Sequence, residues 1–306
     1  MSNHRGRDVL ATVNPLPRSS LIAVAGRALG RVPPTAQVLA GIVSVQIGAA
    51  MAKQLFATVG STGTVALRLF FAAVILLVVW RPSLRLSRRA WAVVVSYGLV
   101  LGAMNLCFYL ALARLPLGVT VTITFLGPLS VAIGGSRRWL DGLWALLAAG
   151  GVVLLAEGGS GDVQLVGILL ALAAAACWAS YILLSVALGR HTTDGGGLAI
   201  GMALATIVVA PIGIADAGTA LLEPRVLAVG FAVALLSSVI PYSLELEALR
   251  RMPPKVFGVL MSLEPAVAAL VGLVLLGEIL SVTQWLAVLM VVAASVGATR
   301  TASHAY

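Results

Sequence analysis

The sequence predicts an all-α integral membrane protein with ten transmembrane helices, arranged as two inverted five-helix repeats. Three observations predict this fold class. The 306 residues are 60% hydrophobic and only 10% charged, with a mean hydropathy of +1.06, whereas roughly a quarter of the residues in a soluble domain are charged. The apolar residues are grouped into windows of membrane-spanning length. Most arginines lie in the short stretches between these windows.

Ten apolar windows follow one another along the chain. At about 1.5 Å per residue, each is long enough to cross ~30 Å of hydrocarbon as a helix. A helix also satisfies its own backbone groups, as a lipid environment requires. The first five windows cover residues 36–57, 62–80, 90–112, 117–135 and 139–157, and the second five cover 164–188, 195–216, 226–248, 255–276 and 281–299.

The positive charges predict which ends of the windows face the cytoplasm. If the N-terminus is cytoplasmic, 16 of the 20 Lys and Arg residues fall on the cytoplasmic side, and only Arg114 and Arg225 fall outside. The remaining two, Lys53 and Arg68, lie within windows. Cytoplasmic loops of membrane proteins carry an excess of Lys and Arg. This asymmetry predicts an even number of spans and cytoplasmic N- and C-termini.

An internal repeat divides the chain into halves. A shift of 137 residues places Arg114 on Arg251 and Pro128 on Pro265, and it also aligns Pro116 with Pro253. Because each repeat holds five windows, an odd number, the halves must have opposite orientations in the membrane. Inverted repeats of this kind build many secondary transporters, with the substrate site near the membrane midplane.

The predicted organisation has four parts: a disordered basic cytoplasmic tail at 1–35, a first repeat at 36–157, a second repeat at 158–299 and a short cytoplasmic C-terminus at 300–306. The net charge of +9 sits at window ends, so we expect the bilayer, not nucleic acid, as its partner. No phosphate-binding G-x-x-x-x-G-K-[ST] motif occurs, and we expect neither an enzyme nor a cofactor or metal. The oligomeric state is left open.

Glu264 is the main candidate for a functional side chain. It lies about nine residues into the ninth window, ~14 Å deep by helical rise, where a charge costs ~2.5–3.5 kcal/mol on insertion scales. A position facing a polar cavity lowers that cost, so we expect Glu264 to bind substrate or carry protons. A structural hydrogen bond to a neighbouring helix is the alternative. Pro265 and its repeat partner Pro128 predict helix kinks in the two halves.

Other polar side chains within the windows are candidates for the same substrate-binding or proton-coupling site. Lys53 and Arg68 are candidates for binding a carboxylate, with snorkelling to the lipid headgroups as the alternative. Structural packing is the alternative for most of the others. Trp178 and Tyr181 are candidates for a cavity wall or an ammonium site. The remaining candidates are Gln46, Asn105, Tyr109, Thr124, Tyr242 and Glu245.

Several stretches resemble the threonine/homoserine exporter branch of the EamA-type drug/metabolite transporters. The stretches specific to the branch are "GAAMAKQLF" (48–56), "YGLVLGAMNLCFYLALARLPLG" (97–118) and "PYSLELEALRRMP" (241–253). Others are "GPLSVAIGGSRR" (127–138), "ACWASYILLS" (176–185) and "MSLEPAVAALVGLVLLGE" (261–278). The resemblance covers about 36–299. The relatives differ at one candidate position, where they carry a glutamate in place of Thr124.

The resemblance implies a secondary active exporter in the inner membrane, which carries small neutral amino acids such as threonine or homoserine and is driven by the proton gradient. One alternative is a carrier of the same fold for another metabolite or a drug-like amine. A second alternative, from another class, is a membrane scaffold or receptor that transports nothing. Charged side chains at the membrane midplane favour a carrier over a scaffold.

Overall fold

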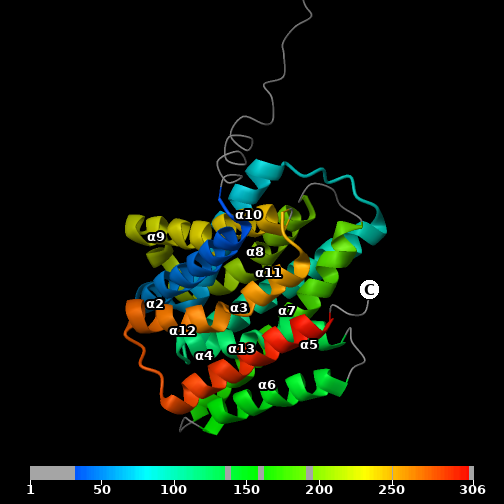
Figure 1. Ribbon diagram of the computed structural model, residues 1–306. Coiled ribbons are helices and arrows are strands. Elements are labelled where there is room, and N and C mark those ends of the chain that lie inside the picture. The colour runs from blue at the N-terminus through cyan, green and yellow to red at the C-terminus, as the bar shows by residue number, and fades with distance from the viewer. Residues whose placement is uncertain (1–31, 135–138, 158–161, 191–195, 250, 303–306) are drawn as a thin grey trace, which may run out of the picture.

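The computed structural model describes residues 32–134, 139–157, 162–190, 196–249 and 251–302. All regular structure within these ranges is helical (Figure 1). The basic tail expected at 1–35 lies almost entirely outside the described residues, and so does most of the expected C-terminus at 300–306. The first described helix begins at Pro34, and the last ends at Ala302.

The helices lie where the apolar windows predict them, with differences of a few residues at their ends. Pro34, Pro224 and Pro254 each occupy the first position of a helix, where a missing N–H costs no hydrogen bond. The elements are α2 (Pro34–Trp80), α3 (Arg88–Leu112), α4 (Leu117–Thr124), α5 (Leu126–Gly134), α6 (Trp139–Glu157), α7 (Asp162–Gly189), α8 (Gly196–Ala217), η1 (Gly218–Leu222), α9 (Pro224–Ala234), η2 (Leu235–Val239), α10 (Ile240–Leu249), α11 (Pro254–Met261), α12 (Glu264–Leu276) and α13 (Val282–Ala302).

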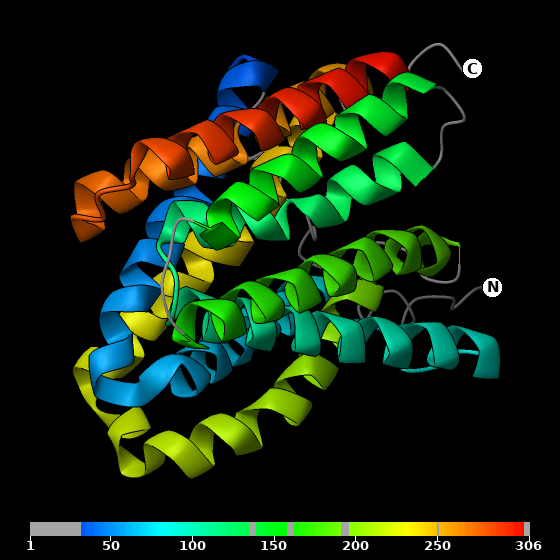
Figure 2. The ribbon, with the colours of Figure 1, turned by 90° about the horizontal axis from the view of Figure 1, so that it is seen from below.

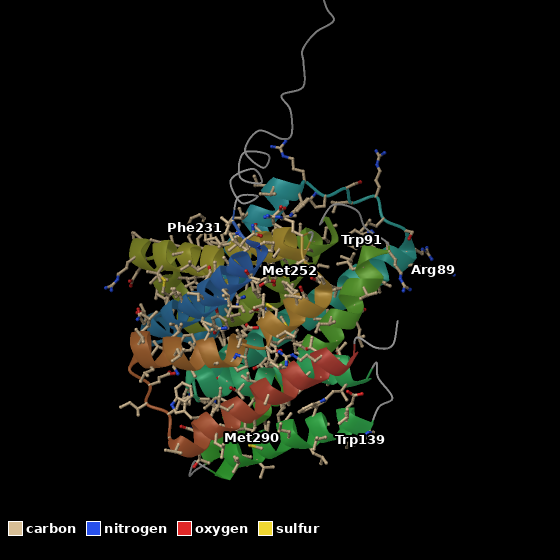
Figure 3. The ribbon with its side chains drawn as sticks, viewed as in Figure 1. Arg89, Trp91, Trp139, Phe231, Met252 and Met290 are labelled. Carbon is tan, nitrogen blue, oxygen red and sulfur yellow. The ribbon has the colours of Figure 1, made fainter. Side chains whose placement is uncertain are left out.

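The exterior of the bundle is apolar. Many Leu, Ile, Val and Phe side chains point outward, and Trp139, labelled in Figure 3, is 80% exposed. Eight helical segments in the described ranges are long and apolar enough to cross a membrane, and the apolar helix Trp139–Leu155 is shorter. An apolar surface of this extent suits lipid and not water. The chain is therefore a multi-pass membrane protein.

Helix α2 is interrupted at Gly60, which divides it into two helical segments. Gly60 has φ 67° and ψ 176°, a backbone conformation that is open almost only to glycine. The Thr64 hydroxyl donates to the Gly60 carbonyl at 2.6 Å, which supplies a partner at the start of the second segment. The break falls between the windows predicted at 36–57 and 62–80.

Two further windows are interrupted at matching places. The window at 117–135 forms α4 and α5, which are divided at Phe125, three residues before Pro128. The window at 255–276 forms α11 and α12, divided at Ser262 and Leu263, directly before Glu264 and Pro265. Proline cannot donate the backbone hydrogen bond that a continuous helix would require there.

The broken helices lie at the centre of the packing. Helix α12 packs on both α4 and α2, and α4 also packs on α7. Around them α2 contacts α8, α9 and α10, while α3 contacts α7 and α8. Helices α6 and α13 lie side by side at one edge of the bundle (Figure 2). Side chains that point inward from α2, α10 and α12 therefore meet inside the protein.

Candidate functional site

Glu264 lies inside the bundle and not against lipid. Glu264 is only 7% exposed. Its Oε1 accepts a hydrogen bond from Nε2 of Gln46 on α2 at 3.2 Å. Gln46 is 1% exposed. The second oxygens of both side chains, Oε2 of Glu264 and Oε1 of Gln46, are buried without a partner among the described residues. Two unpaired polar atoms thus lie close together in the interior.

The helix break explains why the chain places Glu264 beside Pro265. Glu264 is the first residue of α12, so its carboxylate sits at the positive end of the helix macrodipole, which stabilises an anion. Pro265 follows at the second position, where a helix needs no N–H donor. The glutamate and the proline both suit the start of a helix deep in the protein, whereas both would be costly in its middle.

A second acidic group lies near the first. Glu245 on α10 is close enough to Glu264 to interact with it electrostatically, and Tyr242, one turn earlier, interacts with both Glu245 and Arg68. Arg68 lies on the second segment of α2. Residues from α2, α10 and α12 therefore form one polar cluster. We call it the central cluster, and it consists of Gln46, Arg68, Tyr242, Glu245 and Glu264.

Arg68 is held by two neutral groups. Its Nη2 donates to the backbone carbonyl of Ser237 at 3.1 Å, and its Nη1 donates to the Tyr109 hydroxyl at 3.4 Å. The guanidinium carbon also lies 5.6 Å from the centroid of the Tyr109 ring. Arg68 makes no ion pair with a described residue, so its positive charge has no direct counter-ion within that part of the chain.

Aromatic side chains border the central cluster. The rings of Tyr97 and Tyr181 lie 5.1 Å apart between centroids, and Tyr181 is close enough to Tyr242 to interact with it. Trp178, one turn before Tyr181, instead makes an edge-to-face contact with Phe125 at the break between α4 and α5. Tyr181 thus lies with the cluster, whereas Trp178 packs against the broken helix.

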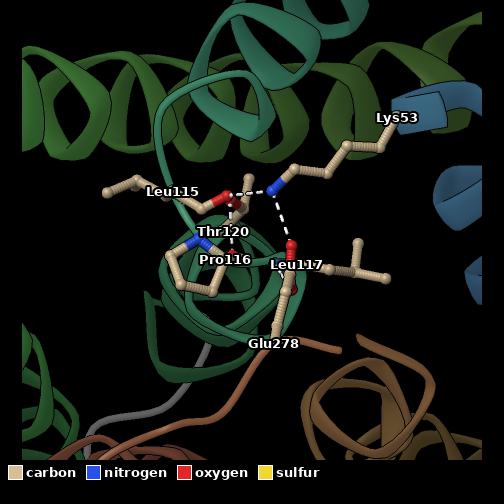
Figure 4. A network of polar contacts seen from close by, with 6 residues as sticks. All are labelled: Lys53, Leu115, Pro116, Leu117, Thr120 and Glu278. Carbon is tan, nitrogen blue, oxygen red and sulfur yellow. Dashed lines mark hydrogen bonds and ion pairs between the residues drawn. The ribbon is translucent and has the colours of Figure 1, made fainter. Parts of the chain in front are cut away.

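Lys53 is in a different place from Arg68. Its Nζ forms an ion pair with Oε1 of Glu278 at 2.6 Å and donates to the Leu115 carbonyl at 2.8 Å (Figure 4). The other oxygen of Glu278, Oε2, accepts from the backbone N–H of Leu117 at 2.7 Å. This network, the Lys53–Glu278 tie, joins α2 to the start of α4 and to the loop after α12. Lys53 is therefore already paired within the protein.

Two of the expected site residues bond to their own helices. The Thr124 hydroxyl donates to the Thr120 carbonyl at 2.6 Å, and the Asn105 amide donates to the Leu101 carbonyl at 2.9 Å. Both side chains are buried. The single hydroxyl donor of Thr124 is thereby used within α4, whereas Asn105 keeps its second amide N–H and its carbonyl oxygen for another group.

The sequence interpretation missed Ser44 and Ser237. The Ser44 hydroxyl donates to the Leu236 carbonyl at 2.8 Å, and the Ser237 hydroxyl oxygen is buried without a partner among the described residues. Leu236 and Ser237 belong to η2, a π-helical turn between α9 and α10. The pair of serines in "LLSSV" (235–239), inside an apolar window, is the signal that marks this position.

A pocket of about 670 Å³ lies at the Gly60 break. It is lined by Thr58, Ser61, Arg114 and Asp216 among others, and Asp216 accepts a hydrogen bond from Thr62 at 2.8 Å. The residues of the central cluster do not line this pocket. Pro265 directly follows Glu264 of the central cluster, and neither Pro265 nor Pro128 lines this pocket.

The chain matches the model of the EamA-like transporter family over residues 165–300. It is 44% identical over 271 residues to "Threonine/homoserine exporter RhtA" of Salmonella typhimurium (strain LT2), and 43% identical to the protein of that name in Escherichia coli (strain K12). Each alignment covers 88% of this chain and 92% of the relative. A further match is "Uncharacterized transporter YwfM" of Bacillus subtilis (strain 168), 25% identical over 76% of this chain and 83% of that protein.

A solved structure, described only as "Crystal structure of protein", shares the fold. It superposes with a TM-score of 0.57, covering 88% of this chain and 98% of the other, at 20% sequence identity. At this identity the likeness concerns the fold alone.

Proposed function

Because this chain belongs to the EamA-like transporter family, we propose that it is a secondary active exporter of small neutral amino acids. Its relatives at 43–44% identity are named as exporters of threonine and homoserine, and we take these as the substrate class. The observation that carries the proposal is the buried carboxyl of Glu264, with one oxygen bound to Gln46 and the other unpaired. A merely structural acid would be expected to have both oxygens satisfied.

The proposed architecture has ten membrane crossings. A straight helix of the 47 residues of α2 would be about 70 Å long, more than twice the ~30 Å of hydrocarbon. The Gly60 break supports two crossings instead. With α6 counted as a short crossing, five crossings precede residue 158 and five follow residue 161.

The packing supports two inverted halves. The 137-residue shift of the internal repeat pairs helices of the two halves. The second segment of α2 corresponds to α8, and α6 corresponds to α13. Helix α5 corresponds to part of α12. Equivalent helices that lie close to a two-fold axis can pack on each other across it. Helix α2 does pack on α8, and α6 packs on α13. The broken windows also meet, where α4 packs on α12.

The arginine distribution supports cytoplasmic N- and C-termini in the inner membrane. In this orientation the Lys53–Glu278 tie lies at the outer end of the bundle, next to the start of α4. Breaking this tie would separate α2 and α4 from the loop after α12. We propose that it holds the outer side closed.

Glu264 is the proposed proton-coupling group. Its burial disfavours the charged carboxylate, while the start of α12 and the Gln46 amide stabilise that charge. These opposing influences allow the group to exist in both forms. In the proposed cycle Glu264 takes up a proton from outside, and substrate binding from the cytoplasm competes with that proton. Proton influx thereby drives amino-acid export.

The substitution Glu264→Gln tests this mechanism in proteoliposomes. Glutamine keeps the side-chain shape and its hydrogen-bonding contact with Gln46, but it cannot carry a proton. We expect threonine transport driven by an imposed pH gradient to fall to the level of protein-free liposomes, while threonine–threonine exchange continues. The exposed acid Glu223 supplies the control, because Glu223→Gln should leave both activities unchanged. Undiminished gradient-driven transport in Glu264→Gln would remove Glu264 from the mechanism.

A further inference from the structure

The π-helical turn η2 presents backbone acceptors to α2. A π turn is rare, is usually a single turn within an α-helix, and often occurs at a functional site. Here two successive carbonyls of η2 accept side-chain donors from the two segments of α2. Leu236 accepts from Ser44 at 2.8 Å, and Ser237 accepts from Arg68 at 3.1 Å. The turn therefore fixes the position of the Arg68 guanidinium.

Two polar groups at this turn have no hydrogen-bond partner among the described residues, and both are donors. Arg68 Nε is buried without an acceptor among the described residues, and so is the hydroxyl of Ser237, the residue whose carbonyl holds Nη2. A buried donor that is left unsatisfied destabilises the protein, and more strongly where the group is charged. A guanidinium offers Nε–H and one Nη–H side by side, in a fork that matches the two oxygens of a carboxylate.

The charge balance also points to an anion. Two cations lie inside the predicted spans and away from their ends, Lys53 and Arg68. Lys53 is neutralised by Glu278 at 2.6 Å, whereas the partners of Arg68 within the described ranges are a carbonyl, a hydroxyl and an aromatic ring. A charge within a membrane protein calls for a partner. An amino-acid substrate brings one carboxylate, and of these two cations Arg68 is the one that no described carboxylate neutralises.

We propose that Arg68 and the Ser237 hydroxyl form the subsite for the substrate's α-carboxylate. Arg68 binds the carboxylate through the Nε edge of its guanidinium, and Ser237 donates a further hydrogen bond. This inference rests on the proposed function, because it assumes an amino-acid substrate. It makes the carboxylate, and not the ammonium group or the side chain, the feature that Arg68 recognises.

Competition binding with purified protein in lipid nanodiscs tests the subsite. Radiolabelled threonine is displaced either by unlabelled threonine or by threonine amide, which lacks the carboxylate. In the wild-type protein we expect threonine amide to bind at least about 100-fold more weakly, because the charged hydrogen bonds to Arg68 are lost. In Arg68→Lys we expect threonine to bind about 10- to 100-fold more weakly. Threonine amide should bind with unchanged affinity, so the preference for threonine over threonine amide is lost.

Two further variants separate recognition from support of the fold. Ser237→Ala should weaken threonine binding about tenfold, again without affecting threonine amide. Ser44→Ala removes the other side-chain hydrogen bond to η2 and should leave the preference for threonine unchanged. A merely structural role for Arg68 would weaken both ligands equally in Arg68→Lys, and that result would overturn the subsite while leaving the exporter in place. Wild-type protein that binds no small neutral amino acid would overturn the proposed function together with the subsite.

Discussion

At the scale of single residues, the cost of a buried charge marks Glu264 as a candidate functional residue. The partners of Glu264 and of Lys53, however, come from distant parts of the chain. Hydropathy alone placed this carboxyl near the midplane. Gln46 is 218 residues away in sequence, and Glu278 is 225 residues from Lys53. Such pairings depend on how helices pack, which a single sequence does not reveal. For that reason Lys53 and Arg68 were grouped as equivalent cations, although only Lys53 has a carboxylate partner among the described residues.

The Lys53–Glu278 tie should stabilise the protein measurably. Both side chains are mostly buried, at 24% and 15% exposed, so removing one partner leaves the other poorly solvated. We expect Lys53→Met to lower the free energy of unfolding by about 1.5–3 kcal/mol. The measurement is reversible unfolding in mixed micelles. When Lys53→Met is combined with Glu278→Gln, the free energy of unfolding should fall by less than the sum of the decreases in the two single variants.

The exposed hydrogen bond between Thr62 and Asp216 provides the control for this double-mutant cycle of Lys53 and Glu278. Asp216→Asn should change the free energy of unfolding by no more than about 0.5 kcal/mol. Additive effects of Lys53→Met and Glu278→Gln would show that the tie contributes nothing as a pair.

At the scale of helices, the sequence predicted most elements because hydropathy is a local property. Prolines at 128 and 265 pointed to the regions where the helices break, since a missing N–H also acts locally. The π turn η2 was not predicted. Its residues, Leu235–Val239, contain no proline or glycine, and the carbonyls of Leu236 and Ser237 are satisfied by Ser44 and Arg68, which belong to another helix.

The Gly60 break gives a prediction at this scale. Alanine at position 60 would have to adopt φ 67°, which costs about 1–3 kcal/mol for a residue with a Cβ. We expect Gly60→Ala to lower the free energy of unfolding by this amount. Gly142 in α6 is the matched control, because a Cβ there meets nothing within 4 Å and alanine favours a helix. Equal stability of the two variants would argue against a strained turn at Gly60.

At the scale of the whole molecule, the proposed transport cycle requires access to the central cluster from each side of the membrane in turn. The inverted repeats stay a prediction, which rests on proline and arginine positions that recur at a fixed shift. The proposed closure of the outer side could not be predicted from the sequence, because it rests on the ion pair between Lys53 on α2 and Glu278 in the loop after α12. Gln46 and Glu264 of this cluster are buried, so we expect exchange of substrate to require the two proposed halves to move.

Thiol labelling at position 237 tests this central claim most directly. Ser237→Cys is introduced after Cys107 and Cys177 have been replaced by alanine, and membrane-impermeant reagents are applied to right-side-out and inside-out vesicles. We predict labelling from both sides, with threonine slowing it. The control is Ser295→Cys, a buried position where Ser295 pairs with Ser262 at 2.7 Å, which should stay unlabelled. Ser237→Cys that resists labelling from both sides, or reacts equally fast with and without threonine, would contradict the account.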